Sequence, residues 1–135
     1  NNEEFLSIRV QNIKDRQGQI LKNNLSNQLN PKNIKKTSKY HLFVNYGEGK
    51  EELGYRKDMS ATRTNLIHNA TYQLKIIKTG ETILKGSAAI TSSYDVVESI
   101  YATIIAEKNA RIKGLKIISD IVVNEIAIYF NNKKS

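Results

Sequence analysis

The last third of the chain carries one long helical pattern, and this pattern limits the folds that the rest can form. From about Ser99 to Phe130, apolar residues recur at the three- and four-residue spacing of an amphipathic helix. At 1.5 Å per residue such a helix is a rod of roughly 46 Å. That length exceeds the diameter of a compact sphere built from 135 residues, so we expect a single, elongated domain.

Two apolar lines run along this helical segment. A broad face should cover a sheet and contains Tyr101, Ile104, Ile105, Ile112, Leu115, Val122, Ile126 and Phe130. A second line, near the opposite side, contains Ala110, Ile117, Ile121 and Ile128. A two-layer domain would leave this second line exposed, unless the first helix packs beside it or the helix bends. Because an exposed apolar stripe usually marks a partner, we predict a partner interface at Ile117, Ile121 and Ile128.

The segments before this helix alternate between apolar and polar residues, as half-buried strands do. The first strand is predicted within Phe5–Val10, the second from Tyr40 to Tyr46, and the third over Thr62–Thr79. Thr79-Gly80 provides turn residues for a hairpin into a fourth strand. In that strand Leu84, Gly86, Ala88 and Ile90 should face inward.

Helix and loop signals lie between these strands. Asp15 is a good N-cap for a short helix that Pro31 would end soon after Leu29. Three glycines, at positions 47, 49 and 54, predict a loop or bulged excursion after the second strand. This excursion would also contain Arg56, Lys57 and Asp58.

The order strand, helix, strand, strand, strand, helix predicts an α+β two-layer sandwich. We expect a mostly antiparallel four-stranded sheet with two helices packed on one face. Residues 1–135 should form a single domain, with a disordered tail over residues 131–135. The expected shared core is Leu6, Ile8, Leu42, Val44, Leu66, Leu74, Leu84, Ile90, Leu115 and Val122.

The charge balance favours polyanionic partners. The chain has 21 Lys and Arg against 13 Asp and Glu, a formal net charge of +8. Nucleic acid, anionic lipid head groups and phosphorylated glycolipids are the partner classes that such an excess attracts. The alternative is compositional bias, because Lys greatly outnumbers Arg and Asn and Ile are abundant, as an AT-rich genome would produce.

Signatures of catalysis and metal binding are missing from the sequence. The chain has no Cys, which excludes thiolate metal sites and thiol nucleophiles. His41 and His68 lie on different predicted strands, and Gly49-Lys50 fails to complete a phosphate-binding loop. No apolar run approaches the roughly 20 residues that span a bilayer. We therefore expect no enzymatic activity, no metal and no cofactor.

Three blocks of sequence resemble the LptE family, outer-membrane lipoproteins of lipopolysaccharide assembly, and most closely its alphaproteobacterial form. They follow one another in the expected order along nearly the whole chain. The blocks are Asp15–Gln19 leading into Leu21–Leu25; Ala61–Arg63 with Ala70–Leu74 and Thr79–Gly80; and Ser93–Val97 with Tyr101–Thr103, Ala106–Ala110 and Tyr129–Phe130.

The resemblance implies a non-enzymatic plug of a membrane barrel. LptE-like proteins sit inside the β-barrel of LptD, help that barrel to fold, and bind lipopolysaccharide. They are held at the periplasmic face of the outer membrane by a lipidated N-terminal Cys. This chain has no Cys, so the resemblance implies an anchor that precedes the sequence given.

The resemblance also implies where lipopolysaccharide would bind. The family's basic contacts lie before the third strand, where Arg56, Lys57 and Arg63 align loosely, and near the start of the last helix, where Ser99–Thr103 has no basic match. We add three lysines around the hairpin as supporting charges. The predicted lipopolysaccharide site is thus Arg56, Lys57, Arg63, Lys75, Lys78 and Lys85.

Two other functional classes are compatible with the composition. A basic nucleic-acid-binding α/β module would usually present several aromatic residues for base stacking. Here Phe43 is the single aromatic at the outward strand positions, and Arg is scarce, so we expect no nucleic acid partner. A free-standing periplasmic lipid-binding enzyme lacks any catalytic constellation. A lipoprotein signal peptide ending in Cys in the unprocessed product would separate the plug from both alternatives.

Overall fold

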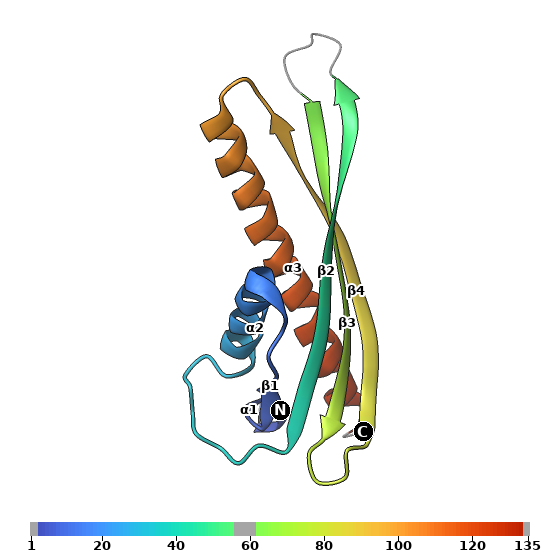
Figure 1. Ribbon diagram of the computed structural model, residues 1–135. Coiled ribbons are helices and arrows are strands. Elements are labelled where there is room, and N and C mark those ends of the chain that lie inside the picture. Colours follow the sequence, from blue (N-terminus) through green and yellow to red (C-terminus); the bar gives the residue numbers. More distant parts are fainter. Residues whose placement is uncertain (1–2, 56–61, 134–135) are drawn as a thin grey trace.

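One layer of the molecule is a four-stranded sheet, and the helices lie on one of its faces (Figure 1). The computed structural model describes residues 3–55 and 62–133. This arrangement confirms the α+β two-layer sandwich that the sequence predicts. The elements in chain order are α1 (Glu3–Leu6), β1 (Ile8–Val10), α2 (Asp15–Leu29), β2 (Tyr40–Tyr55), β3 (Thr62–Ile76), β4 (Thr82–Val96) and α3 (Ile100–Lys133).

The strands lie side by side in sequence order, β1-β2-β3-β4. The three long strands form an antiparallel meander in which Leu42 of β2 pairs with Leu74 of β3, and Leu74 pairs with Leu84 of β4. β1 adds to the outer side of β2 in parallel, with Val10 opposite Leu42. Gly80, at φ 74°, provides the left-handed turn residue between β3 and β4. The sheet is therefore mostly antiparallel, as predicted.

The N-terminal segment differs from the prediction. The strand expected within Phe5–Val10 is reduced to three residues, because the four-residue helix α1 precedes it. Leu6 therefore belongs to a helix and is only half-buried, and Ser7 closes this helix through its backbone N–H to the carbonyl of Glu4 at 3.1 Å. Asp15 does not cap α2. It is the first residue of that helix at φ 72°, and the capping position is Lys14.

The second strand is much longer than predicted. The loop expected from Gly47 is absent from the described residues, because β2 continues to Tyr55. Gly47 pairs with Asn69 of β3, so strand pairing overrides the local preference of glycine for turns. Arg56, Lys57 and Asp58 lie outside the described residues. At the other end of the chain, α3 continues to Lys133, so the tail expected from residue 131 is helical over its first three positions.

The main core lies between the meander, α2 and the second half of α3. Leu42, Leu74, Leu115 and Val122 are fully buried, as predicted. Leu66 is also fully buried but belongs to a separate small cluster with Tyr94 and Ala110. Leu84 and Ile90 are only partly buried at the margin of the core. Ala88, which the sequence predicts to face inward, is buried in the main cluster, and the buried members that the sequence did not indicate include Ile13 and Ile118.

The expected sheet-covering face of α3 is confirmed only for its second half. Leu115, Val122, Ile126 and Phe130 are at most 3% exposed. Tyr101, Ile104, Ile105 and Ile112 are instead 75%, 59%, 38% and 46% exposed. The cause is the length of α3, which extends well beyond α2 in Figure 1. In this extension the small residues Ala110 and Gly114 are buried in place of the predicted ones.

Candidate functional site

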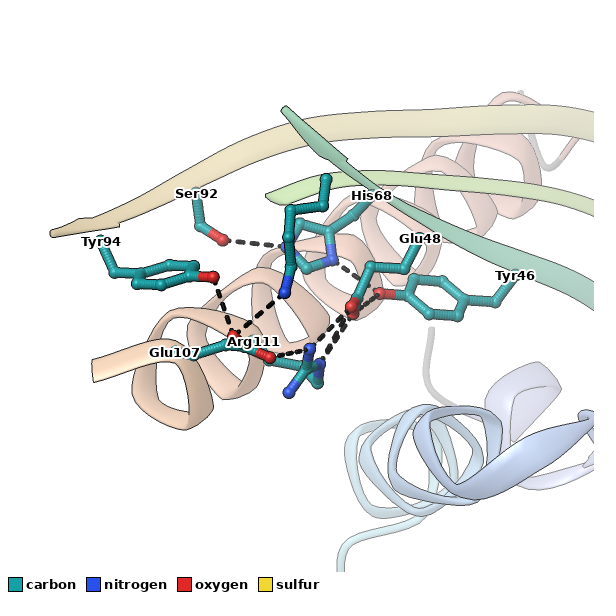
Figure 2. Close-up of polar contacts among 8 residues, drawn as sticks. Tyr46, Glu48, His68, Ser92, Tyr94, Glu107 and Arg111 are labelled. Carbon is teal, nitrogen blue, oxygen red and sulfur yellow. Dashed lines mark hydrogen bonds and ion pairs between the residues drawn. The ribbon is translucent and has the colours of Figure 1, made fainter. Parts of the chain in front are cut away.

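A cluster of eight polar residues joins α3 to the three long strands (Figure 2). Its members approach from four elements and form a continuous set of hydrogen bonds and ion pairs. We call this the polar seam: Tyr46, Glu48, Lys50, His68, Ser92, Tyr94, Glu107 and Arg111.

Arg111 of α3 is the centre of the charged half of the seam. Its guanidinium donates to both carboxylate oxygens of Glu48, at 2.8 to 3.1 Å, and to Glu107 at 2.9 Å. Glu107 also accepts from the hydroxyl of Tyr94 at 2.8 Å and from Lys50 at 3.2 Å. Hydrogen bonds from Arg111 and Tyr94 lower the pKa of Glu107 to about 2. The seam thus fixes α3 against β2 and β4 through charge-assisted bonds.

His68 forms the neutral half of the seam. Its ring is fully buried and has hydrogen bonds at both nitrogens, with Tyr46 Oη at 2.6 Å from Nδ1 and Ser92 Oγ at 2.9 Å from Nε2. Burial lowers the pKa of His68 below its ordinary value, so the ring is uncharged at neutral pH. The ring therefore links β3 to β2 and β4 beneath α3.

The helix-free face of the sheet carries a small basic hollow of about 410 Å³. Lys75 of β3 and Lys85 of β4 border it, and the ammonium of Lys75 lies 5.4 Å from the centre of the Phe43 ring. Phe43 is 41% exposed there, and Asn45 and Gln73 provide amides. We call this the open-face hollow. It combines two cations, an aromatic surface and neutral hydrogen-bonding groups.

The structure brings together only part of the predicted basic site. Lys75 and Lys85 share the open-face hollow, and Lys78 lies in the turn between their strands. Arg63 lies twelve positions from Lys75 along β3, roughly 40 Å away, and forms an ion pair with Asp95 at 3.7 Å. Arg56 and Lys57 are outside the described residues.

A second exposed surface lies where α3 begins. It is apolar, although the chain is rich in Lys, and it extends beyond the end of α2. We call it the distal apolar surface: Val97, Ile100, Tyr101, Ile104, Ile105 and Ile112. The sequence pattern identified four of these residues but placed them against the sheet, since no local pattern shows which part of α3 packs beside α2.

The predicted partner line on α3 has a mixed environment. Ile128 is 51% exposed, whereas Ile117 and Ile121 are half-buried, and Ile121 packs against the main core. Over residues 3–55 and 62–133, no helix is long and apolar enough to cross a membrane. Within the same ranges, no three metal-binding side chains gather at one point.

Comparisons with known proteins identify the fold. No family model matches the chain, and no curated protein sequence matches it. A candidate lipoprotein from Caulobacter crescentus is similar in structure, with TM-score 0.76, 17% identity, and coverage of 95% of this chain and 93% of that one. The minor lipoprotein from Acinetobacter baumannii has TM-score 0.67 and 14% identity, covering 95% of each chain.

Rare lipoprotein B from Shewanella oneidensis gives the same result. Its TM-score is 0.67 at 12% identity, with coverage of 96% of this chain and 98% of that one. The three similarities extend over nearly the full length of every chain, so they involve the whole α+β architecture rather than a shared hairpin. The chain therefore has a fold that is found in bacterial lipoproteins.

Proposed function

We propose that this protein is a lipid-anchored lipoprotein of the outer membrane, where it acts as an LptE-like plug of the LptD barrel and binds lipopolysaccharide. The observation that carries the proposal is the full-length structural similarity to bacterial lipoproteins, including rare lipoprotein B. The resemblance of three sequence blocks to the LptE family supports the finer assignment. The role is non-enzymatic, with no metal or cofactor.

The distal apolar surface supports a protein partner. Tyr101 and Ile104 are 75% and 59% exposed, and they lie near the start of α3 at one end of an elongated molecule. Apolar side chains gathered in this way gain free energy when a partner removes them from water. In this proposal the inner wall of the barrel covers the distal apolar surface.

The open-face hollow supports binding of an anionic glycolipid. Lys75 and Lys85 provide positive charge for phosphate groups, and charge-assisted hydrogen bonds are the stronger polar contacts. Phe43 provides an apolar ring beside these charges. Lys78 in the adjoining turn would supply further attraction to the lipid. Arg63, at the far end of β3, would contact another part of the same lipid, and the predicted contacts Arg56 and Lys57 lie outside the described residues.

Capture of the barrel tests the partner proposal. Ile104→Lys combined with Tyr101→Glu should leave the domain folded, because both side chains are mainly in solvent, and should weaken co-purification with LptD at least tenfold. The matched control is Ile34→Lys, which alters an exposed apolar residue in the loop after α2, outside the distal apolar surface. Unchanged capture by the double variant would exclude the distal apolar surface as the contact.

Ligand binding tests the glycolipid proposal. Lys75→Glu with Lys85→Glu should abolish most lipopolysaccharide binding, whereas Lys32→Glu with Lys35→Glu, an equal change of charge on an exposed loop, should have little effect. Arg56→Glu with Lys57→Glu tests the loop predicted from the sequence. Each variant is measured at two salt concentrations, because screening weakens contacts between exposed charges.

Duplex DNA is the comparison ligand for the nucleic-acid alternative. Loss of lipopolysaccharide binding alone supports the proposal, because a general basic surface would bind both polyanions. If the variant lost binding to lipopolysaccharide and to duplex DNA equally, the open-face hollow would be a general basic surface. Full binding of lipopolysaccharide by Lys75→Glu with Lys85→Glu would remove the hollow from the proposal.

A further inference from the structure

The outer edge of β4 is unpaired in the described part of the chain. β4 is the last strand in the sheet order and pairs with β3 on one side only, along fifteen residues. The N–H and C=O groups on its other side therefore point away from the sheet. Such an edge is a ready template for another strand.

β4 also lacks the features by which proteins usually protect an edge. Its central stretch, Gly86–Tyr94, contains no charged residue and no proline, and its pairing with β3 is regular throughout this stretch. On the opposite side of the sheet β1 covers β2 only at Tyr40–Leu42, and the remaining edge of β2 is protected by contrast. It carries Glu48, Lys50, Glu51 and Glu52 and has an irregular register near Tyr55.

We propose that the occupant of the β4 edge is the β4 edge of a second copy of this chain. The two strands pair antiparallel about a two-fold axis through Ile90, so that each residue lies opposite the residue equally far on the other side of position 90. Such a symmetric interface uses the same surface on both copies. The pairing joins two four-stranded sheets into one sheet of eight strands.

Charge complementarity fixes this register. Lys85 and Asp95 are the charged residues nearest to the two ends of the neutral stretch, and both are five positions from Ile90. Pairing about Ile90 places Lys85 of each copy directly opposite Asp95 of the other, and directly opposed unlike charges stabilise antiparallel pairs. Asp95 keeps its ion pair with Arg63, because a carboxylate accepts from several donors.

The neighbouring pairs are uncharged. Gly86 lies opposite Tyr94 of the other copy. Within one copy Gly86 already lies opposite Tyr72, whose ring occupies the space that a Cβ atom would need. Leu84 lies opposite Val96, which is 37% exposed in a single copy. The dimer therefore covers apolar side chains at both ends of the pairing.

The structure leaves room for the incoming side chains. A groove of about 490 Å³ lies between the end of β4 and the first half of α3. It is lined by Val97 and by Ala102, Ala106 and Ala110, whose small side chains keep α3 from filling it. In the proposed register, Leu84 of the second copy lies beside Val96, next to this groove.

Two residues of the predicted partner line on α3, Ile121 and Ile128, also bear on the proposed dimer. α2 contacts α3 at Ser119 and Asp120, through Gln28. At 100° per residue, Ile121 and Ile128 are more than 120° around the helix from the middle of this contact. They therefore face away from α2, and in the proposed dimer the α3 helix of the second copy would lie on that side.

The absence of Cys allows a direct test of the register. Ser87 and Ser93 oppose each other across the proposed axis, so their Cα atoms should be about 4.5–5.5 Å apart. A mixture of Ser87→Cys and Ser93→Cys chains, oxidised with diamide, should form a disulfide-linked dimer. Each variant alone should not, because its own two copies of the residue are roughly 20 Å apart.

Sedimentation of the purified protein tests the energetics. Wild type should reach a monomer–dimer equilibrium, and Lys85→Asp should weaken the dimer about tenfold through two like-charge pairs. Lys85→Asp with Asp95→Lys and Arg63→Asp should restore it, because the third change keeps unlike charges at positions 63 and 95 within each copy. The matched control Lys108→Asp, on α3, should not weaken the dimer. A wild type that remains monomeric, or a disulfide that forms equally well in the single-variant samples, would overturn the proposal.

Discussion

Gly114 of α3 lies directly against the imidazole of His68 on β3. A Cβ atom at position 114 would approach two ring carbons of His68 to 2.6 Å, closer than real Cβ atoms approach any neighbour. The same ring is held by Tyr46 and Ser92, so it has no free direction in which to move. The distance between α3 and the sheet is therefore set at this point by the absence of a side chain.

Gly114→Ala should destabilise the protein. The added methyl group must displace either α3 or the ring of His68, and forced overpacking of this kind costs about 1–3 kcal/mol. The expected result is a lower urea midpoint with an unchanged slope. Gly49→Ala is the matched control, since nothing lies within 4 Å of a Cβ atom there. A Gly114→Ala variant as stable as wild type would show that α3 can shift freely.

Stability should fall as the pH drops from about 7 toward 5.5. Burial lowers the pKa of His68 in the folded state, so the unfolded chain takes up a proton first, near its ordinary pKa of about 6.5. The stabilisation by neutral His68 is thus complete above that pH and is lost below it. Urea unfolding measured across this range should show an unfolding free energy that falls with pH in wild type and in His41→Gln, but not in His68→Gln.

Acid should weaken the charged half of the polar seam. The pKa of Glu107 is lowered from 4.5 to about 2, mainly by Arg111. Its contribution is therefore fully present above about pH 4.5 and lost as the pH falls toward 2. Glu107→Gln should reduce the unfolding free energy at pH 7 by about 1–3 kcal/mol. It should also make the unfolding free energy depend less on pH below about pH 4.5. Asp120→Asn, which removes an exposed pair with Lys116, should do neither.

Leu74→Ala should reduce the unfolding free energy by about 2–5 kcal/mol, because it opens a cavity in the centre of the main core. Leu74 is fully buried between Leu42 and Leu84 in the meander. The control is Leu53→Ala on β2, where the side chain is 51% exposed. Equal losses for the two variants in chemical denaturation would contradict the position of the core.

The sequence predicts the meander well because alternation is a local signal. The shared face of Leu42 and Leu74 follows from period two, and the hairpin that pairs Leu74 with Leu84 follows from the turn at Gly80. The prediction from sequence is wrong at Gly47, a glycine that favours turns but is held in β2 by its pairing with Asn69 of β3. The prediction is also wrong at Leu6, because a four-residue helix is too short to show a periodic pattern of apolar residues.

The candidate surfaces were only partly predictable. Residue types and alternation place Lys75, Lys85 and Phe43 on the outward side of their strands, but only the register brings them around one hollow. The polar seam could not be found in this way, since Glu48 and Arg111 are 63 positions apart in the chain. Their contact depends on how α3 crosses the sheet, which no local pattern specifies.

The polar seam also divides the hydrophobic interior into two unequal parts. Eighteen buried residues form the main cluster, whereas Leu66, Tyr94 and Ala110 form the small cluster beyond His68. So little buried apolar surface gives the distal end a low free energy of local opening compared with global unfolding. Amide hydrogens in the first three turns of α3 should therefore exchange with solvent long before those near Val122. In this fold the end that presents its apolar residues to water can open and close without the rest of the protein unfolding.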